Sequence, residues 1–177
     1  MKQRVDGRRW LETDGGPFLL APVSLLPSWT GYEGDYDLVI EATDAGRSEC
    51  YALSGRNVVI LGDEPLRTTI MESRSLIVQW IYSNSEDDIR VHAAELDLDS
   101  IAWSEGPVLE CDGSFALMDA AIPGAEATAE SMFVIEVEAG KVRVDSTEVP
   151  LAPHCAAKLH RMVLASSTPP ARPRFRR

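Results

Sequence analysis

The segment Trp10-Leu-Glu-Thr-Asp-Gly-Gly-Pro-Phe-Leu-Leu20, with Trp29-Thr-Gly31 and Asp35-Tyr36 shortly after it, decides how this chain begins to fold. The two adjacent glycines allow backbone angles with positive φ, and the proline that follows fixes its own φ and removes a backbone donor. These properties predict a fixed turn that leads into a short apolar strand. The two tryptophans are large enough to anchor that turn to a core, so we expect them to be buried, together with Trp80 and Trp103.

Outward from this segment, short apolar runs recur between turn signals, which is typical of β-strands. Glu49–Leu53 and Asn57–Leu61 flank Ser54-Gly55-Arg56, a spacing that predicts a hairpin. The run SLIVQWIYS at Ser75–Ser83 is almost continuously apolar and predicts a central strand. Further strands are predicted at 18–21 and 36–42, and a single helical turn between Pro22 and Pro27.

Alternating apolar residues predict a second hairpin at Met132–Asp145. A two-residue turn at Ala139-Gly140 would place Glu138 opposite Lys141 and Glu136 opposite Arg143. These glutamates then have basic partners and are not counted among the binding residues. The alternation assigns to the buried side Phe133, Ile135, Val137, Val142 and Val144.

Two segments are compatible with either helix or strand. In Glu86–Leu96 the spacing of the apolar residues, and Ser85 followed by three acids, favour a helix, although Ile89 and Val91 also alternate as in a strand. Val149–Ala165 fits both types. The predicted fold is α+β and β-dominated, one domain of mostly antiparallel sheet with one or two short helices. This domain spans 10–166, between a basic lead (1–9) and a disordered Arg/Pro-rich tail (167–177).

Charge is distributed unevenly along the 177 residues, whose net charge is −11. Without the Arg-rich ends, residues 10–167 hold nine basic and 27 acidic residues, a net charge of −18. Such a body repels nucleic acid and membrane surfaces and attracts basic partners. The chain has no apolar run as long as a membrane span and begins without the apolar region of a secretory leader, which predicts a cytoplasmic protein. Its three scattered cysteines predict buried free thiols.

Motifs for chemistry are missing from the sequence. The three histidines and three cysteines have no metal-ligand spacing, and neither a nucleophile elbow nor a phosphate-binding loop occurs. Paired carboxylates are plentiful, but nothing selects one pair for acid–base hydrolysis. We therefore predict a protein that is not an enzyme, with no catalytic residue, no metal site and no cofactor.

Several motifs taken together resemble the Immunity protein 21 family, the predicted antidotes of bacterial polymorphic toxin systems. The resemblance runs from Trp10 to Arg161, and its more specific parts are the Gly-Gly-Pro and Asp-Glu-Pro-Leu-x-Thr motifs. The family has a cysteine shortly after the Asp-Tyr pair, where this chain has Ile40, so no thiol is required there. The motifs are WLETDGGPFLL, Trp29-x-Gly31, Asp35-Tyr36, LGDEPLRTT at 61–69, the strand with Trp80, and LMDAAIPG at 117–124.

The resemblance implies tight binding to one cognate toxin without catalysis. Because many antibacterial toxins are nucleases with basic grooves, an acidic surface would be steered towards such a partner. The predicted binding residues are Tyr32, Asp35, Asp37, Asp63, Glu64, Glu86, Asp87 and Asp88. Capping of turns and stabilisation of a helix N-terminus are equally good explanations for most of these acids.

Two other functions remain open at this stage. One is a small-molecule or regulatory binding module in which Gly15–Pro17 and Asp63–Pro65 line a pocket. The other is a hydrolase that uses a carboxylate pair.

Overall fold

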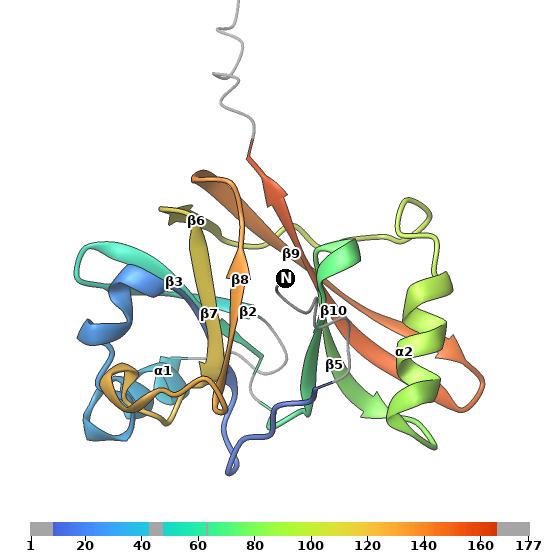
Figure 1. Ribbon diagram of the computed structural model, residues 1–177, viewed down its shortest axis with the longest axis horizontal. Helices are drawn as coiled ribbons and strands as arrows, with labels where there is room; N and C mark the ends of the chain where they lie inside the picture. Colours follow the sequence, from blue (N-terminus) through green and yellow to red (C-terminus); the bar gives the residue numbers. More distant parts are fainter. Residues whose placement is uncertain (1–8, 43–47, 63, 166–177) are drawn as a thin grey trace, which may run out of the picture.

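Two five-stranded antiparallel sheets pack against each other in the computed structural model, which describes residues 9–42, 48–62 and 64–165 (Figure 1). Sheet I has the strand order β2 (Ser48–Leu53), β3 (Arg56–Leu61), β1 (Phe18–Pro22), β7 (Ser114–Asp119) and β8 (Met132–Glu136). Sheet II has the order β4 (Thr68–Met71), β5 (Leu76–Tyr82), β10 (Cys155–Leu164), β9 (Gly140–Ala152) and β6 (Val108–Cys111). The predicted β-dominated α+β class is confirmed.

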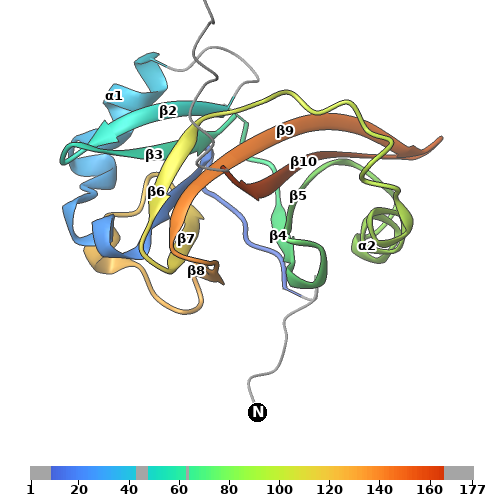
Figure 2. The same ribbon diagram turned by 90° about the horizontal axis from the view of Figure 1, so that it is seen from above.

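Both sheets are buried on both faces at their centres. Their inner faces share one apolar core, to which sheet I contributes Phe18 and Phe115 and sheet II contributes Ile77 and Val144. The outer face of sheet I is covered by the 3₁₀ turn η1 (Val23–Ser28), by Trp29 and by helix α1 (Asp35–Ala42), and the 3₁₀ turn η2 (Gly31–Glu33) contacts α1. Helix α2 (Glu86–Glu95) covers the outer face of sheet II (Figure 2). Two further 3₁₀ turns are η3 (Glu72–Arg74) and η4 (Gly124–Glu126).

Most of the local predictions are confirmed. Strand β1 is buried at every position, and β2 and β3 form the expected hairpin around Ser54 and Gly55, both of which have positive φ. Strand β5 pairs on both sides, with β4 and β10, as a central strand must. Helix α2 begins after Ser85, whose hydroxyl accepts a hydrogen bond from the Asp88 amide.

Helix α1 corrects the prediction of a strand at 36–42. The run YDLVIEA has β-branched and apolar residues on neighbouring positions, but of residues 36–41, whose burial is described, only Val39 is fully buried, on the side that faces sheet I. Asp35 fixes the start of the helix, because its carboxylate accepts hydrogen bonds from the backbone amide and hydroxyl of Thr30. That local side-chain contact favours a helix over an extended strand.

The second predicted hairpin is wrong, although its burial pattern is right. Phe133 and Ile135 are buried in sheet I, where β8 pairs with β7, whereas Val142 and Val144 are buried in sheet II, where β9 pairs with β6 and β10. The connection between β8 and β9 therefore crosses from one sheet to the other. Each strand finds a partner that is distant in sequence, because both then direct their apolar side chains into the shared core.

The predicted charge pairs do not form across this connection. Lys141 lies opposite Glu110, Glu136 lies opposite Ser114, and Arg143 binds Glu105 and Asp145. Glu136 and Glu138 therefore do not lie opposite Arg143 and Lys141 in a hairpin.

Two other points are settled by the structure. The segment left open at 149–165 is strand, since β10 covers Cys155–Leu164. Cys111 and Cys155 are buried free thiols as predicted, but Cys50 is exposed, because it lies on β2 at the edge of sheet I. The end segments 1–8 and 166–177 lie outside the described residues.

Candidate functional site

The predicted binding residues lie in two groups at opposite ends of the molecule. Tyr32, Asp35 and Asp37 belong to η2 and α1, whereas 86–88 begin α2 on the other sheet (Figure 1). Glu64 is exposed in the connection that leads to β4, and Asp63 lies outside the described residues. One continuous acidic surface that joins all of them is therefore not present in the described residues.

The acids at the start of α2 are engaged within the protein. The Glu86 carboxylate lies 2.5 Å from the Arg67 guanidinium, which also bonds Glu12 at 2.7 Å. Asp87 is paired with Arg90 at 2.5 Å. Negative side chains in the first turn also stabilise a helix through its dipole, so this end of the molecule has a structural explanation for its charge.

Around Arg67 the contacts are largely structural. Its guanidinium lies over the rings of Trp10 and Trp80, with 5.9 Å and 5.5 Å to the ring centroids. The two indoles pack edge to face at 5.6 Å. Trp29 is 1% exposed, and the other three tryptophans are partly buried against the outer core of sheet II. The prediction that the tryptophans serve the core is confirmed.

Asp35 also has a structural role. Besides its two bonds from Thr30, its carboxylate accepts one from the Tyr51 hydroxyl at 3.2 Å. Asp37, two residues further along the chain, is exposed. Capping therefore accounts for Asp35 and leaves Asp37 as the carboxylate of this pair that faces solvent.

The outward side of α1 and η2 exposes large apolar side chains among acids. Tyr32, Leu38 and Ile40 are 59%, 55% and 40% exposed. Negative charge on Glu126 raises the pKa of the Tyr32 hydroxyl, which also hydrogen-bonds to that carboxylate. We call this set the α1 surface; it consists of Tyr32, Glu33, Asp37, Leu38, Ile40 and Glu41, all of them exposed.

The sequence motifs meet one another in the interior. Leu11 exchanges two backbone hydrogen bonds with Thr68, which joins the first motif to 61–69. The Trp29 indole N–H donates to the Ala120 carbonyl at 2.9 Å, and the Asp14 amide donates to the Asp119 carboxylate at 3.2 Å. These contacts join the motifs to one another inside the fold and help to hold it together.

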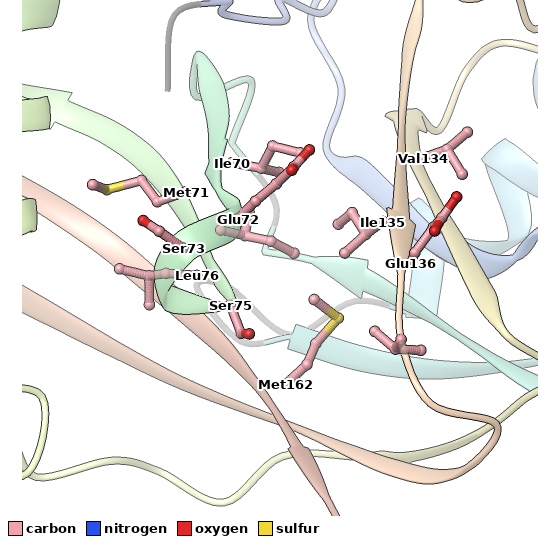
Figure 3. Close-up of a pocket in the computed structure, with 12 residues that line it drawn as sticks. Ile70, Met71, Glu72, Ser73, Ser75, Leu76, Val134, Ile135, Glu136 and Met162 are labelled. Carbon is pink, nitrogen blue, oxygen red and sulfur yellow. The ribbon is translucent and has the colours of Figure 1, made fainter. Parts of the chain in front are cut away.

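A cavity of about 620 Å³ opens between β8, an edge strand of sheet I, and β4, an edge strand of sheet II. One wall is formed by β4, η3 and β5, and the other by β8 (Figure 3). Ile135 projects from β8 towards the opposite wall, and Glu72 extends from η3 towards β8. Its lining does not include Gly15–Pro17 or Glu64–Pro65, the residues predicted for a pocket. The lining residues are Ile70, Met71, Glu72, Ser73, Ser75, Leu76, Ile77, Val134, Ile135, Glu136, Val137 and Met162.

A buried polar network crosses sheet II. His160 is fully buried, with its Nδ1 2.7 Å from the Ser146 hydroxyl and its Nε2 2.7 Å from the Gln79 side-chain oxygen. Burial lowers the pKa of His160 to about 3, and Lys158 acts in the same direction. A histidine that is neutral and closed off from solvent has no access to a substrate, so this Ser–His contact is structural.

Asp145, on strand β9 of sheet II, is buried and charged, and it is paired with Arg143 and Arg161. Burial would raise its pKa, but hydrogen bonds from Arg143 and Arg161 outweigh burial and lower it.

Among the described residues no group of three or more His, Cys, Asp or Glu side chains is arranged to hold a metal ion. Within the same part of the chain, no helix has the length and apolar character needed to cross a membrane.

Comparison with known proteins identifies the family. A family model described as Immunity protein 21 matches residues 9–154, which is most of the chain. The chain belongs to the Immunity protein 21 family. The match includes the converging motifs, the α1 surface and every lining residue of the cavity except Met162. Searches of curated proteins and of solved structures gave no significant match.

Proposed function

We propose that this member of the Immunity protein 21 family binds a cognate bacterial toxin and neutralises it by occlusion, without catalysis of its own. The single observation that supports a location for the toxin interface is the α1 surface. There the fold exposes an aromatic and two aliphatic side chains beside carboxylates, while Val39 holds the helix to the core.

Exposed apolar groups of this kind are the usual centre of a protein interface. Interfaces take most of their free energy from a few desolvated aromatic or aliphatic residues with a polar rim. Tyr32, Leu38 and Ile40 supply such a centre, and the acids of the α1 surface supply the rim. The three apolar side chains are the candidates for the largest losses on truncation.

The charge of the body supports a basic partner. Carboxylates at the rim of an interface raise the rate of association with a basic surface, and salt screens this effect. A basic nuclease-type toxin fits the net charge of −18 carried by residues 10–167. Glu64 and the acids at the start of α2 are proposed to add to this field, and their internal partners reduce what 86–88 contribute.

The proposal expects a gene for a large secreted toxin immediately upstream of this chain's gene, and the test uses the C-terminal domain of that toxin. Co-expression with the wild-type chain is expected to rescue cells from that domain, and the purified pair is expected to form a complex. Leu38→Ala and Ile40→Ala are expected to weaken the complex by about 5- to 30-fold each, the effect of losing about 1–2 kcal/mol.

Val91→Ala provides the matched control, since Val91 is a 47% exposed aliphatic side chain on α2 at the far end of the molecule. Its complex should be unchanged. Asp37→Lys should slow association and flatten the salt dependence, and the triple change of Glu86, Asp87 and Asp88 to Lys should have a smaller effect. Failure of the wild-type chain to rescue cells from the neighbouring toxin would remove the proposed function.

A further inference from the structure

Helix α1, which carries Leu38 and Ile40 on its outward side, packs against the protein through its inward side. Two of its side chains contact the outer core of sheet I: Val39 is fully buried and Tyr36 is partly buried. Tyr36 belongs to the first turn of the helix and precedes both exposed aliphatic residues. The position of the Tyr36 ring therefore helps to set the direction in which Leu38 and Ile40 project.

The Tyr36 ring lies directly against Gly16, the second glycine of the Gly-Gly-Pro motif. A Cβ atom added at Gly16 would lie 2.7 Å from Cε2 and 2.9 Å from Cζ of this ring, and closer still to its hydroxyl oxygen. Carbon atoms pack at about 3.5–4.0 Å, so the ring fits here only because residue 16 has no side chain. Gly16 is buried, and its φ lies outside the left-handed region, unlike that of Gly15 at +119°. Close packing against Tyr36, and not backbone conformation, is therefore what favours glycine at position 16.

Asp119 connects the same turn to the other part of the α1 surface. Its carboxylate accepts hydrogen bonds from the Asp14 amide at 3.2 Å and from the Ala121 amide at 2.8 Å. The Ala121 carbonyl in turn accepts a hydrogen bond from the Tyr32 amide, at 2.8 Å. Burial raises the pKa of the Tyr36 hydroxyl and the charge of Asp119 acts in the same direction, so these two side chains are also near each other. One junction therefore bears on both η2 and α1.

We infer that the Gly15–Pro17 turn and Asp119 hold the α1 surface in the geometry that binds the toxin. The turn acts through the Tyr36 ring, and the carboxylate acts through the Ala121 peptide group. The inference rests on the proposed function, because it explains how the same surface is prepared for the same partner. A surface that is held in its bound geometry loses less conformational freedom on association and so binds more tightly. Gly16 and Asp119 are themselves buried, so they affect the toxin only through the elements that they position.

Gly16→Ala tests the inference at a buried position that the toxin does not reach. The new methyl group would displace the Tyr36 ring by about 1 Å and shift the first turn of α1 with it. Affinity for the toxin domain is expected to fall about 5- to 10-fold, mainly through faster dissociation. NMR spectra of the free variant should show changed backbone chemical shifts at Leu38 and Ile40.

A double-mutant cycle shows whether this effect passes through the Tyr36 ring. Tyr36→Leu keeps an apolar side chain but removes the ring atoms that would meet the new methyl group, and it is expected to weaken the complex about threefold. Adding Gly16→Ala to Tyr36→Leu should then cause no further loss, because the two residues are in direct contact and their effects are not additive. Losses that simply multiply would overturn the inference.

Asp119→Ala tests the second path, because it removes the acceptor of both backbone amides. Affinity is expected to fall about tenfold, with a changed NMR shift of the Tyr32 amide in the free protein. Asp119→Asn keeps one acceptor oxygen and the size of the side chain. It should lose affinity about threefold, and it provides the test if the alanine variant does not fold.

Ile89→Val is the control for a general loss of stability. Ile89 is fully buried on α2 and packs in the outer core of sheet II, so removing one of its methyl groups destabilises the protein far from the α1 surface. Its complex with the toxin domain should have wild-type affinity. Thermal unfolding of every variant establishes that each one is folded at the temperature of the binding measurements.

The outcomes separate this inference from the proposed function. If the wild-type chain binds the toxin domain but Gly16→Ala and Asp119→Asn bind equally well, the inference alone is overturned. The same conclusion follows if Gly16→Ala weakens binding with no change in the NMR shifts of α1, or if Ile89→Val weakens it as much. If the wild-type chain forms no complex, the inference and the proposed function are both overturned.

Discussion

His160 should make the stability of this protein fall in mildly acidic solution. The imidazole is fully buried in sheet II, and burial lowers its pKa from 6.5 to about 3. Its hydrogen bonds define the neutral form. Gln79 donates its amide to Thr68, so its oxygen accepts from Nε2–H of His160, and Nδ1 accepts from Ser146.

The sign and the size of this pH effect on the free energy of unfolding follow from the difference in proton binding between the folded and unfolded chains. Below pH 6.5 the unfolded chain takes up a proton that the folded chain refuses until about pH 3. The contribution of His160 is therefore complete above pH 6.5 and is lost as the pH falls towards 3. Between about pH 7.5 and pH 5 the free energy of unfolding should fall by about 2 kcal/mol from this residue alone.

The assay is urea unfolding at a series of pH values, for the wild type and for His160→Gln. The variant loses the acceptor for Ser146 and should be less stable by about 1–3 kcal/mol at neutral pH. Without an ionisable group, it should lose about 2 kcal/mol less on acidification, so the two curves converge by that amount. Comparing the two proteins cancels the carboxylates they share, including Asp119, whose pKa burial raises. Parallel curves would refute the reasoning.

Three further predictions concern the fold around the candidate sites. Gly31→Ala should lower the free energy of unfolding by about 2–4 kcal/mol, because φ of Gly31 is +54° and the new Cβ would lie 2.5 Å from the Ala121 carbonyl oxygen. Gly55→Ala is the control: φ of Gly55 is +78°, but the new Cβ would meet open space, so the free energy of unfolding should fall by only about 1 kcal/mol. Asp35→Ala should cost about 1–2 kcal/mol through loss of its capping bonds, and Asp37→Ala less than about 0.5, both by denaturant unfolding. Cys50 should react with a thiol reagent in the native protein, whereas the two buried cysteines react only after unfolding. A native protein with three reactive thiols would contradict the described burial.

Elements with strong local signals were predictable from the sequence. The β2–β3 hairpin has a Ser54-Gly55 turn that favours positive φ, and α2 has a capping serine followed by three acids. Strand β5 has the continuous apolar run of a strand buried on both faces. In each example the information lies within about ten neighbouring residues.

The predictions from sequence were wrong for two segments whose secondary structure or strand pairing depends on contacts outside the segment. The alternation from Phe133 to Val144 identifies buried side chains, but alternation is the same whether two strands pair with each other or with different sheets. In α1 the β-branched residues suggested a strand, and the capping contact between Thr30 and Asp35 could not be seen from periodicity. Pairing of strands is a long-range property, and a single sequence carries little information about it.

The candidate sites were only partly predictable. Tyr32 and Asp37 were identified by residue type, but Leu38 and Ile40 of the same surface were assigned to a strand and so were missed. The cavity brings together residues from β4, β5, β8 and β10, far apart in the chain, and no motif marks them. The sequence marked the candidate interface mainly by its acidic residues, but several of these acids stabilise the first turn of α2 or the start of α1.

The convergence of the motifs has a consequence for the order of events during synthesis. Strand β1 lies between β3 and β7, so its second neighbour is made about a hundred residues after it. Sheet II in turn needs β10, the last strand. With translation at about 5–20 residues per second, the first motif leaves the ribosome several seconds before its partners exist. Contacts of such long range also fold slowly. A cell therefore obtains the folded protein only when the chain is nearly complete, and a chain terminated early lacks the strand that completes sheet II.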